Sequence, residues 1–79
     1  MSSMKREKLI EYDFLRKNLI ELREDNGFTQ KDIANKLGIS YQSYQAYELG
    51  VAVPTLQNFI KLGNIYDVSL DFLVGKKEY

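Results

Sequence analysis

The chain has 79 residues, with 11 basic and 11 acidic side chains, and it contains neither histidine nor cysteine. This length allows one domain, and a net charge of zero excludes a protein that binds nucleic acid by bulk charge alone. Without histidine and cysteine the chain lacks disulfides and the usual zinc, copper and iron ligand sets, so we expect no metal and no other cofactor.

The first predicted helix carries a leucine stripe and ends at Gly27, where glycine can adopt the left-handed cap. The stripe consists of Leu15, Leu19 and Leu22, with Phe14 and Ile20 beside it. Two starts remain open for this helix: Asp13 is a suitable N-cap, but Leu9 and Tyr12 extend the stripe backward, which would place the start near Ser3 or Lys5.

A second and a third helix are predicted on either side of Leu37-Gly38-Ile39-Ser40. The hydroxyl of Thr29 caps the second helix, and Asp32 completes a capping box with it. We expect the inward residues of the two helices to be Ile33, Ala34, Leu37, Tyr44 and Tyr47. Two short helices joined by a tight glycine turn indicate a helix-turn-helix unit.

A fourth helix, capped by Thr55, and a short fifth helix over 70–74, capped by Ser69, complete an all-α fold. We predict that the inner face of the fourth helix consists of Leu56, Phe59, Ile60 and Gly63. Glycine costs a helix about 1 kcal/mol relative to alanine, so close approach of a neighbouring helix is the expected reason for Gly63. We divide the chain into an extension over 1–12 that can be helical, a helix-turn-helix domain over 13–75 and a frayed tail over 76–79.

The outward face of the third helix carries amides, hydroxyls and a small apolar group instead of charged pairs. Glutamine can bond adenine through two hydrogen bonds, serine donates or accepts, and alanine meets the methyl group of thymine. The candidates for reading bases are Ser40, Tyr41, Gln42, Ser43, Gln45 and Ala46. Gln42 is the first choice among them, and a neutral surface helix is the alternative interpretation of this face.

Five segments together resemble the helix-turn-helix family of phage Cro and lambda-type repressors, also called the XRE family. They are LREDNGFTQ at 22–30, IANKLGIS at 33–40, YELG at 47–50, PTL at 54–56 and VSLD at 68–71. The resemblance implies a compact bundle of five helices in which helices 2 and 3 form the helix-turn-helix. It also implies a transcriptional regulator, most often a dimeric repressor that reads a palindromic operator through the major groove of double-stranded DNA.

Carried over by position, the resemblance makes Gln30 a phosphate contact that also supports the recognition helix. It makes Arg23 and Glu48 an ion pair between the first helix and the end of the third. Tyr44 stands where the family usually has isoleucine or valine, and core packing is favoured over a phosphate contact for its ring. Further phosphate candidates are Lys31, Lys36, Lys61, and the backbone amides of Thr55 and Leu56.

One departure from the family lies in the loop after the third helix, where many relatives carry lysine or arginine. Here the loop is Val51-Ala52-Val53, which cannot neutralise phosphates, so it packs on a neighbouring protomer or shields the core. We therefore expect few phosphate contacts and a shallow salt dependence of operator binding.

A homodimer is expected because one recognition helix reads too few base pairs to specify a site in a genome. Candidates for its surface are Leu70, Phe72, Val74 and Tyr79. An enzyme is not expected, because the chain lacks histidine, cysteine and a glycine-rich phosphate loop. The alternative is an antitoxin or protein-interaction module with secondary DNA binding, which the neutral charge and the apolar loop favour.

Localisation and regulation follow from absences in the sequence. The chain has no apolar run of membrane-spanning length and no secretory leader, so we expect a cytoplasmic protein without a membrane partner. Only four residues follow Gly75, so we expect no small-molecule sensor domain in this chain.

Overall fold

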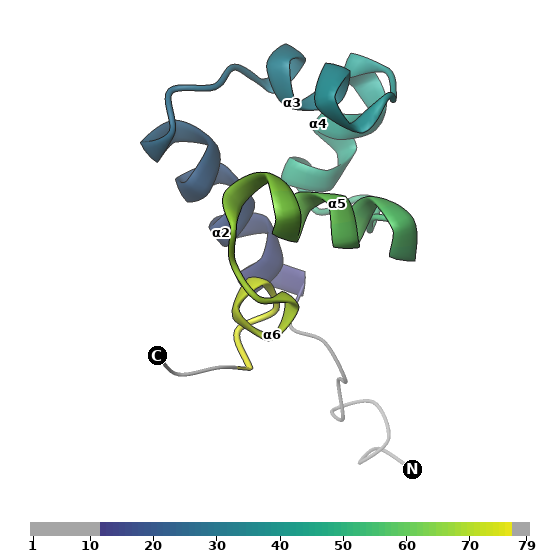
Figure 1. Ribbon diagram of the computed structural model, residues 1–79. Helices are drawn as coiled ribbons and strands as arrows, with labels where there is room; N and C mark the ends of the chain where they lie inside the picture. Colours follow the sequence, from purple (N-terminus) through teal and green to yellow (C-terminus); the bar gives the residue numbers. More distant parts are fainter. Residues whose placement is uncertain (1–11, 77–79) are drawn as a thin grey trace, which may run out of the picture.

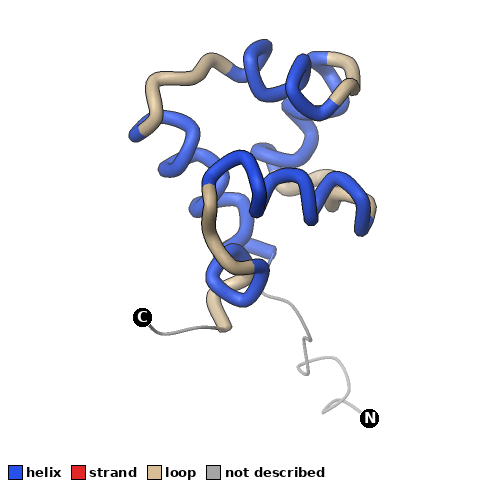
Figure 2. The backbone as a smooth tube through the Cα atoms, viewed as in Figure 1, coloured by secondary structure: helices blue, strands red, loops and turns tan. Residues whose placement is uncertain are grey.

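The computed structural model describes residues 12–76, and all the regular elements in this range are helices (Figures 1 and 2). They are α2 (Tyr12–Asp25), α3 (Gln30–Leu37), α4 (Tyr41–Leu49), α5 (Leu56–Tyr66) and α6 (Leu70–Leu73). The expected all-α fold with five helices is confirmed. An earlier start of the first helix, residues 1–11 of the extension and residues 77–79 of the tail lie outside the described residues.

Short polar side chains fix where the helices begin. The hydroxyls that accept a backbone N–H at the four caps, as predicted, are those of Thr29, Ser40, Thr55 and Ser69. At α3, Asp32 returns a bond from its carboxylate to the backbone N–H of Thr29, at 2.8 Å, so the capping box is complete. These hydrogen bonds from Thr29 hold the pKa of Asp32 below its usual value.

The core gathers between α2 and the other helices. It consists of Leu15, Leu19, Ile33, Ala34, Leu37, Tyr44, Tyr47, Leu62, Tyr66 and Leu73. The predicted inward residues of α3 and α4 all belong to it. In Figure 1, α3 and α4 lie together at one end of the molecule, and α6 lies at the other end beside the beginning of α2.

The inner face of α5 differs from the prediction. Leu56 is 72% exposed and Ile60 is 43% exposed, whereas Leu62 and Tyr66 are buried. Both sets fit a helical stripe through Phe59 and Gly63, so spacing alone could not choose between them. The docking of α5 against α3 and α6 decides the choice.

Close approach at Gly63 is confirmed. A Cβ atom there would lie 2.9 Å from Cδ2 of Leu70 and 3.1 Å from the carbonyl oxygen of Val68. Asn18 holds the C-terminal end of α6, because its Nδ2 donates to the carbonyl oxygens of Phe72 and Leu73 at 3.1 Å each. None of the helices between residues 12 and 76 has the length and hydrophobicity needed to cross a membrane.

Candidate nucleic-acid interface

The helix-turn-helix predicted from the sequence is formed by α3 and α4, which pack against each other around the turn at Gly38. Gly38 has φ +74°, and its N–H bonds to the carbonyl of Asn35 at 3.1 Å. The N–H of Ile39 then bonds to the carbonyl of Ala34 at 3.0 Å. These bonds close α3 and set the position at which Ser40 begins α4.

A buried carboxylate joins three helices at the centre of the unit. Glu48 on α4 is only 4% exposed, and Arg23 on α2 donates to it through Nε at 2.7 Å and through Nη2 at 3.1 Å. From α3, Gln30 donates through Nε2 at 2.9 Å. From α4 itself, the hydroxyl of Tyr44 donates at 2.6 Å. We call Arg23, Gln30, Tyr44 and Glu48 the Glu48 network.

The network keeps Glu48 ionised although it is buried. Burial opposes the charge, but the hydrogen bonds from Arg23, Tyr44 and Gln30 outweigh it and lower the pKa of Glu48 below its ordinary value. The bond to Glu48 likewise raises the pKa of Arg23, against the effect of burial. Burial and the neighbouring carboxylate raise the pKa of Tyr44, so the phenol stays a donor. The ion pair therefore holds α2 and α4 in one relative position.

Arg16 adds a contact that the sequence reasoning missed. Its Nη1 donates to the carbonyl oxygen of Glu48 at 3.4 Å, and its side chain lies against Gly50, where a Cβ would meet Cδ of Arg16 at 3.0 Å. A cation at this position also interacts favourably with the C-terminal end of the α4 dipole. The only sequence signal is a basic residue on α2 one helix turn from Leu19 and two from Arg23.

The predicted base-reading residues lie at the N-cap of α4 and along α4, and they differ in whether another side chain engages them. Ser40 and Ser43 serve the cap, since the Ser43 N–H bonds to the Ser40 Oγ at 3.0 Å and the two hydroxyls are 2.9 Å apart. Gln45 donates to the Tyr41 hydroxyl at 3.1 Å. Gln42 is exposed, and its amide makes no hydrogen bond to any residue between 12 and 76. Its donor and acceptor groups therefore face solvent.

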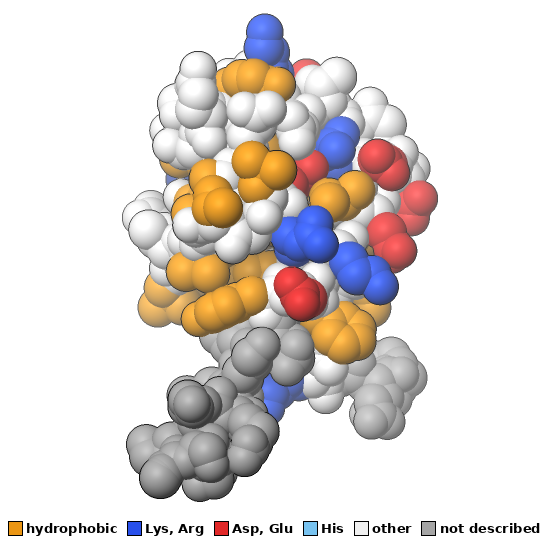
Figure 3. Space-filling view, turned by 180° about the vertical axis from the view of Figure 1, so that it is seen from behind, with side chains coloured by type: hydrophobic (Ala, Val, Ile, Leu, Met, Phe, Trp, Pro, Cys, Tyr) orange, Lys and Arg blue, Asp and Glu red, His pale blue; other side chains and the backbone are white. Residues whose placement is uncertain are grey.

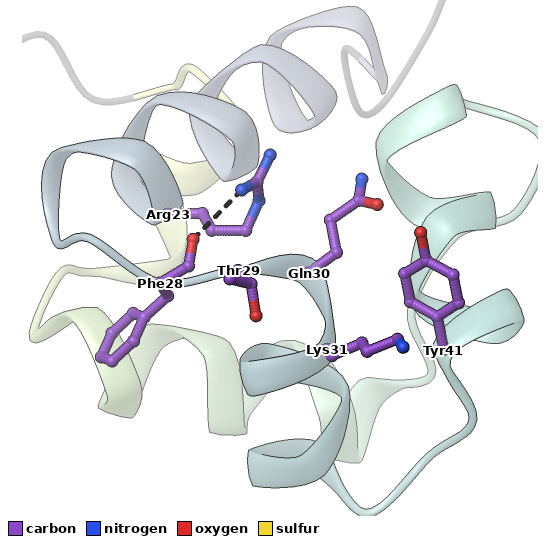
Figure 4. A pocket seen from close by; sticks show the side chains of 6 residues that line it. All are labelled: Arg23, Phe28, Thr29, Gln30, Lys31 and Tyr41. Carbon is purple, nitrogen blue, oxygen red and sulfur yellow. Dashed lines mark hydrogen bonds between the residues drawn. The ribbon is translucent and has the colours of Figure 1, made fainter.

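A shallow depression of about 560 Å³ lies between the start of α3 and the start of α4. Gln30, Lys31 and Tyr41 converge on it in Figure 4, with Arg23 and Phe28 on the far side. The Lys31 ammonium lies 5.4 Å from the centre of the Tyr41 ring. The depression thus combines a cation, an amide and a phenol at an N-terminal helix end, which suits an anionic oxygen.

The remaining phosphate candidates do not converge on this depression. The ammonium of Lys36 lies 5.1 Å from the centre of the Phe28 ring, on another face of α3. Thr55 caps α5, and Leu56 borders a separate apolar groove. Lys61 is half-buried on α5. The structure therefore brings Gln30 and Lys31 together with the start of α4 and leaves the other candidates outside the group.

The candidates for a dimer surface are also divided by the structure. Phe72 is 37% exposed, as expected for a residue that faces away from the core. Val74 is buried and Leu70 packs against the core, so these two side chains are occupied within the protomer. Of the candidates named for a dimer surface, Phe72 alone is exposed among the described residues, and Tyr79 lies outside them.

The family model for the helix-turn-helix matches residues 19–73 of the chain. The chain is 42% identical over 64 residues to the HTH-type transcriptional regulator ImmR of Bacillus subtilis, a match that covers 81% of this chain and 50% of that protein. It is 34% identical over 62 residues to the cryptic phage CTXphi transcriptional repressor RstR of Vibrio cholerae, covering 78% and 55% respectively. The chain spans about half the length of these curated relatives.

The fold also matches a solved structure. The SOS-response transcriptional repressor LexA from Eubacterium rectale superposes with a TM-score of 0.78 at 22% identity, covering 86% of this chain and 72% of that chain. At this identity the likeness shows the fold alone, and it confirms the repressor-type helical bundle expected from the sequence motifs.

Proposed function

This chain belongs to the helix-turn-helix family, and we propose that it is a sequence-specific transcriptional regulator that binds double-stranded DNA in the cytoplasm without enzymatic activity. We further propose that it represses transcription as a homodimer on a palindromic operator. The name of the phage repressor RstR supports repression, because that protein shares 34% identity with this chain.

The observation that carries the proposal is an unengaged amide on a rigidly held helix. Gln42 is exposed at the beginning of α4, while Glu48 at the end of the same helix is fixed by Arg23 and Gln30. A helix held in one position loses little backbone conformational entropy on binding, so the ordering cost at a base contact falls on the Gln42 side chain alone. Gln42 is thus our principal base-reading residue, with adenine as its preferred partner.

The proposed phosphate contact lies at the depression beside α4. Gln30 uses one N–H of its amide for Glu48, and its second N–H remains to donate to a phosphate oxygen. Lys31 supplies the cation, and its position over Tyr41 keeps it beside the groove-facing end of α4. With so few cations grouped here, we expect a shallow salt dependence, with about one or two counterions released at this site per protomer.

Selection of bound duplexes from a random DNA library tests this function, because no operator has to be known in advance. We expect enrichment of two inverted half-sites whose centres lie about one helical turn, ~34 Å, apart. Enrichment of a single asymmetric site would contradict the proposal that the protein binds its operator as a homodimer. Recovery of unselected sequence would contradict specific binding and favour an antitoxin or protein-interaction module that uses the same fold.

A further inference from the structure

The phenol of Tyr41 is a polar group of the depression between α3 and α4 that the proposed function leaves without a role. Tyr41 is the first residue of α4, and the Lys31 ammonium lies 5.4 Å from the centre of its ring. In Figure 4 the Tyr41 hydroxyl and the Gln30 amide lie toward the same side of the depression. The hydroxyl is therefore placed to contact what the depression binds. On the face of the molecule drawn in Figure 3, the Lys and Arg side chains lie apart from one another and beside Asp and Glu, so no broad basic surface is seen there.

The depression itself has little positive charge to offer. Arg23 borders it, but Nε and Nη2 of Arg23 donate to the Glu48 carboxylate, and Nη1 donates to the carbonyl oxygen of Phe28 at 3.1 Å. The Glu48 carboxylate also balances the charge of the guanidinium. Among the described residues that line the depression, this leaves Lys31 as the one cation without an ion pair. Neutral donors are therefore needed to hold an anion firmly here.

Gln45 sets the direction of the Tyr41 proton. It lies one helical turn after Tyr41 on α4, and its Nε2 donates to the Tyr41 hydroxyl oxygen at 3.1 Å. A phenol carries a single O–H proton, and because Gln45 donates to the oxygen, that proton points away from the Gln45 nitrogen. The hydroxyl thus presents a donor to its surroundings. A phosphate oxygen matches this donor, because it accepts hydrogen bonds and does not donate them.

We infer that Tyr41 donates a hydrogen bond to the same DNA phosphate that we assign to Gln30 and Lys31, and that Gln45 is the positioning residue that directs this bond. The site then consists of one cation and two neutral donors, an amide N–H and a phenol O–H. The inference rests on the proposed function and deepens it, because it moves Tyr41 from the base-reading candidates to the backbone contacts.

Fluorescence anisotropy with Tyr41→Phe tests the contact, on duplexes recovered by selection and on scrambled duplexes. The variant keeps the ring beside Lys31 and removes only the hydroxyl, so we expect about a tenfold loss of affinity that is equal for both kinds of duplex. Because the hydroxyl carries no charge, the dependence of affinity on salt should stay as in the wild type, whereas Lys31→Met should reduce its slope by about one. Tyr66→Phe makes the same change at a buried hydroxyl, so it is the matched control and should bind as the wild type does.

A double-mutant cycle separates positioning by Gln45 from a direct contact of Gln45 with DNA. Gln45→Met removes the amide at similar side-chain length, and it should weaken binding about threefold because the phenol must then be ordered on binding. In the Tyr41→Phe background, Gln45→Met should cause no further loss, since the hydroxyl that it directs is absent. Circular dichroism should show that all the variants stay folded.

Three results would overturn the inference. One is a Tyr41→Phe variant that binds both kinds of duplex like the wild type, and another is a loss confined to the selected duplex, which would make Tyr41 a base reader. The third is a loss from Gln45→Met that persists in full in the Tyr41→Phe background, which would make Gln45 itself the DNA contact. Binding to scrambled duplexes does not depend on sequence, so failure of this phosphate contact is distinguishable from failure of base reading by Gln42. A wild-type chain that binds neither duplex would overturn the proposed function and the inference together.

Discussion

Replacing Tyr44 by phenylalanine removes one donor from the Glu48 network and keeps the ring. The phenol hydroxyl lies 2.6 Å from Oε2 of Glu48, and the ring packs edge-to-face on Tyr47 with centroids 5.8 Å apart. A hydrogen bond to a charged acceptor contributes about 1.5–3 kcal/mol. Glu48 keeps its bonds from Arg23 and Gln30, so we expect a loss of about 2 kcal/mol in the free energy of unfolding.

Urea unfolding followed by far-ultraviolet circular dichroism measures this loss. Tyr47→Phe is the matched control, because its hydroxyl on the same helix meets a neutral amide, Nδ2 of Asn58, at 3.1 Å. We expect the control to lose no more than about 1 kcal/mol. Equal losses in the two variants, or none in Tyr44→Phe, would refute the argument that the charged partner of Tyr44 makes its hydroxyl valuable.

Three further variants test other parts of the structure in the same unfolding assay. Tyr66→Phe should leave the free energy of unfolding unchanged or raise it by up to about 1 kcal/mol, because the buried hydroxyl has no hydrogen-bond partner among the described residues. A loss of more than about 1 kcal/mol would show that the hydroxyl has a partner. Gly63→Ala should lower the free energy of unfolding by about 1 kcal/mol, because crowding against Leu70 and Val68 outweighs the gain in helix propensity. A more stable variant would show that the segment between α5 and α6 can move to make room. Glu48→Gln should lower the free energy of unfolding by about 3–5 kcal/mol at neutral pH, because it leaves Arg23 without its anion. It should also flatten the acid limb, the part of the stability–pH curve in which stability falls as pH decreases. The lowered pKa of Glu48 contributes stability that is complete above the unfolded pKa and is lost as pH falls through the folded pKa, so an unchanged acid limb would contradict the role of this carboxylate.

The local features of the fold could be predicted from the sequence because their causes lie within a few residues. Thr29 and Asp32 form a capping box across one helical turn, and Gly38 marks the turn of the helix-turn-helix. The pairing of Arg23 with Glu48 required the family resemblance, because 25 residues separate them and no spacing rule connects them. The comparisons confirm the family, while the roles of the base-reading residues stay predictions.

Other features depend on how helices dock and were outside the reach of spacing rules. Leu56 and Ile60 belong to a stripe as regular as the buried one, so only the placement of α5 determines that they are exposed. The family resemblance implied that Gln30 supports the recognition helix, but which group on α4 it contacts, the carboxylate of Glu48, depends on a side-chain direction that the sequence does not specify.

Binding of Gln42→Ala to duplexes recovered by selection tests the central claim most directly. Fluorescence anisotropy should show that the variant loses about 1–3 kcal/mol against the selected duplex and little against a scrambled duplex, because a base contact carries specificity and a phosphate contact does not. Asn64→Ala, at an exposed position near the C-terminal end of α5, is the control and should bind as the wild type does. An unchanged ratio of selected to scrambled affinity in Gln42→Ala would contradict base reading by the start of α4.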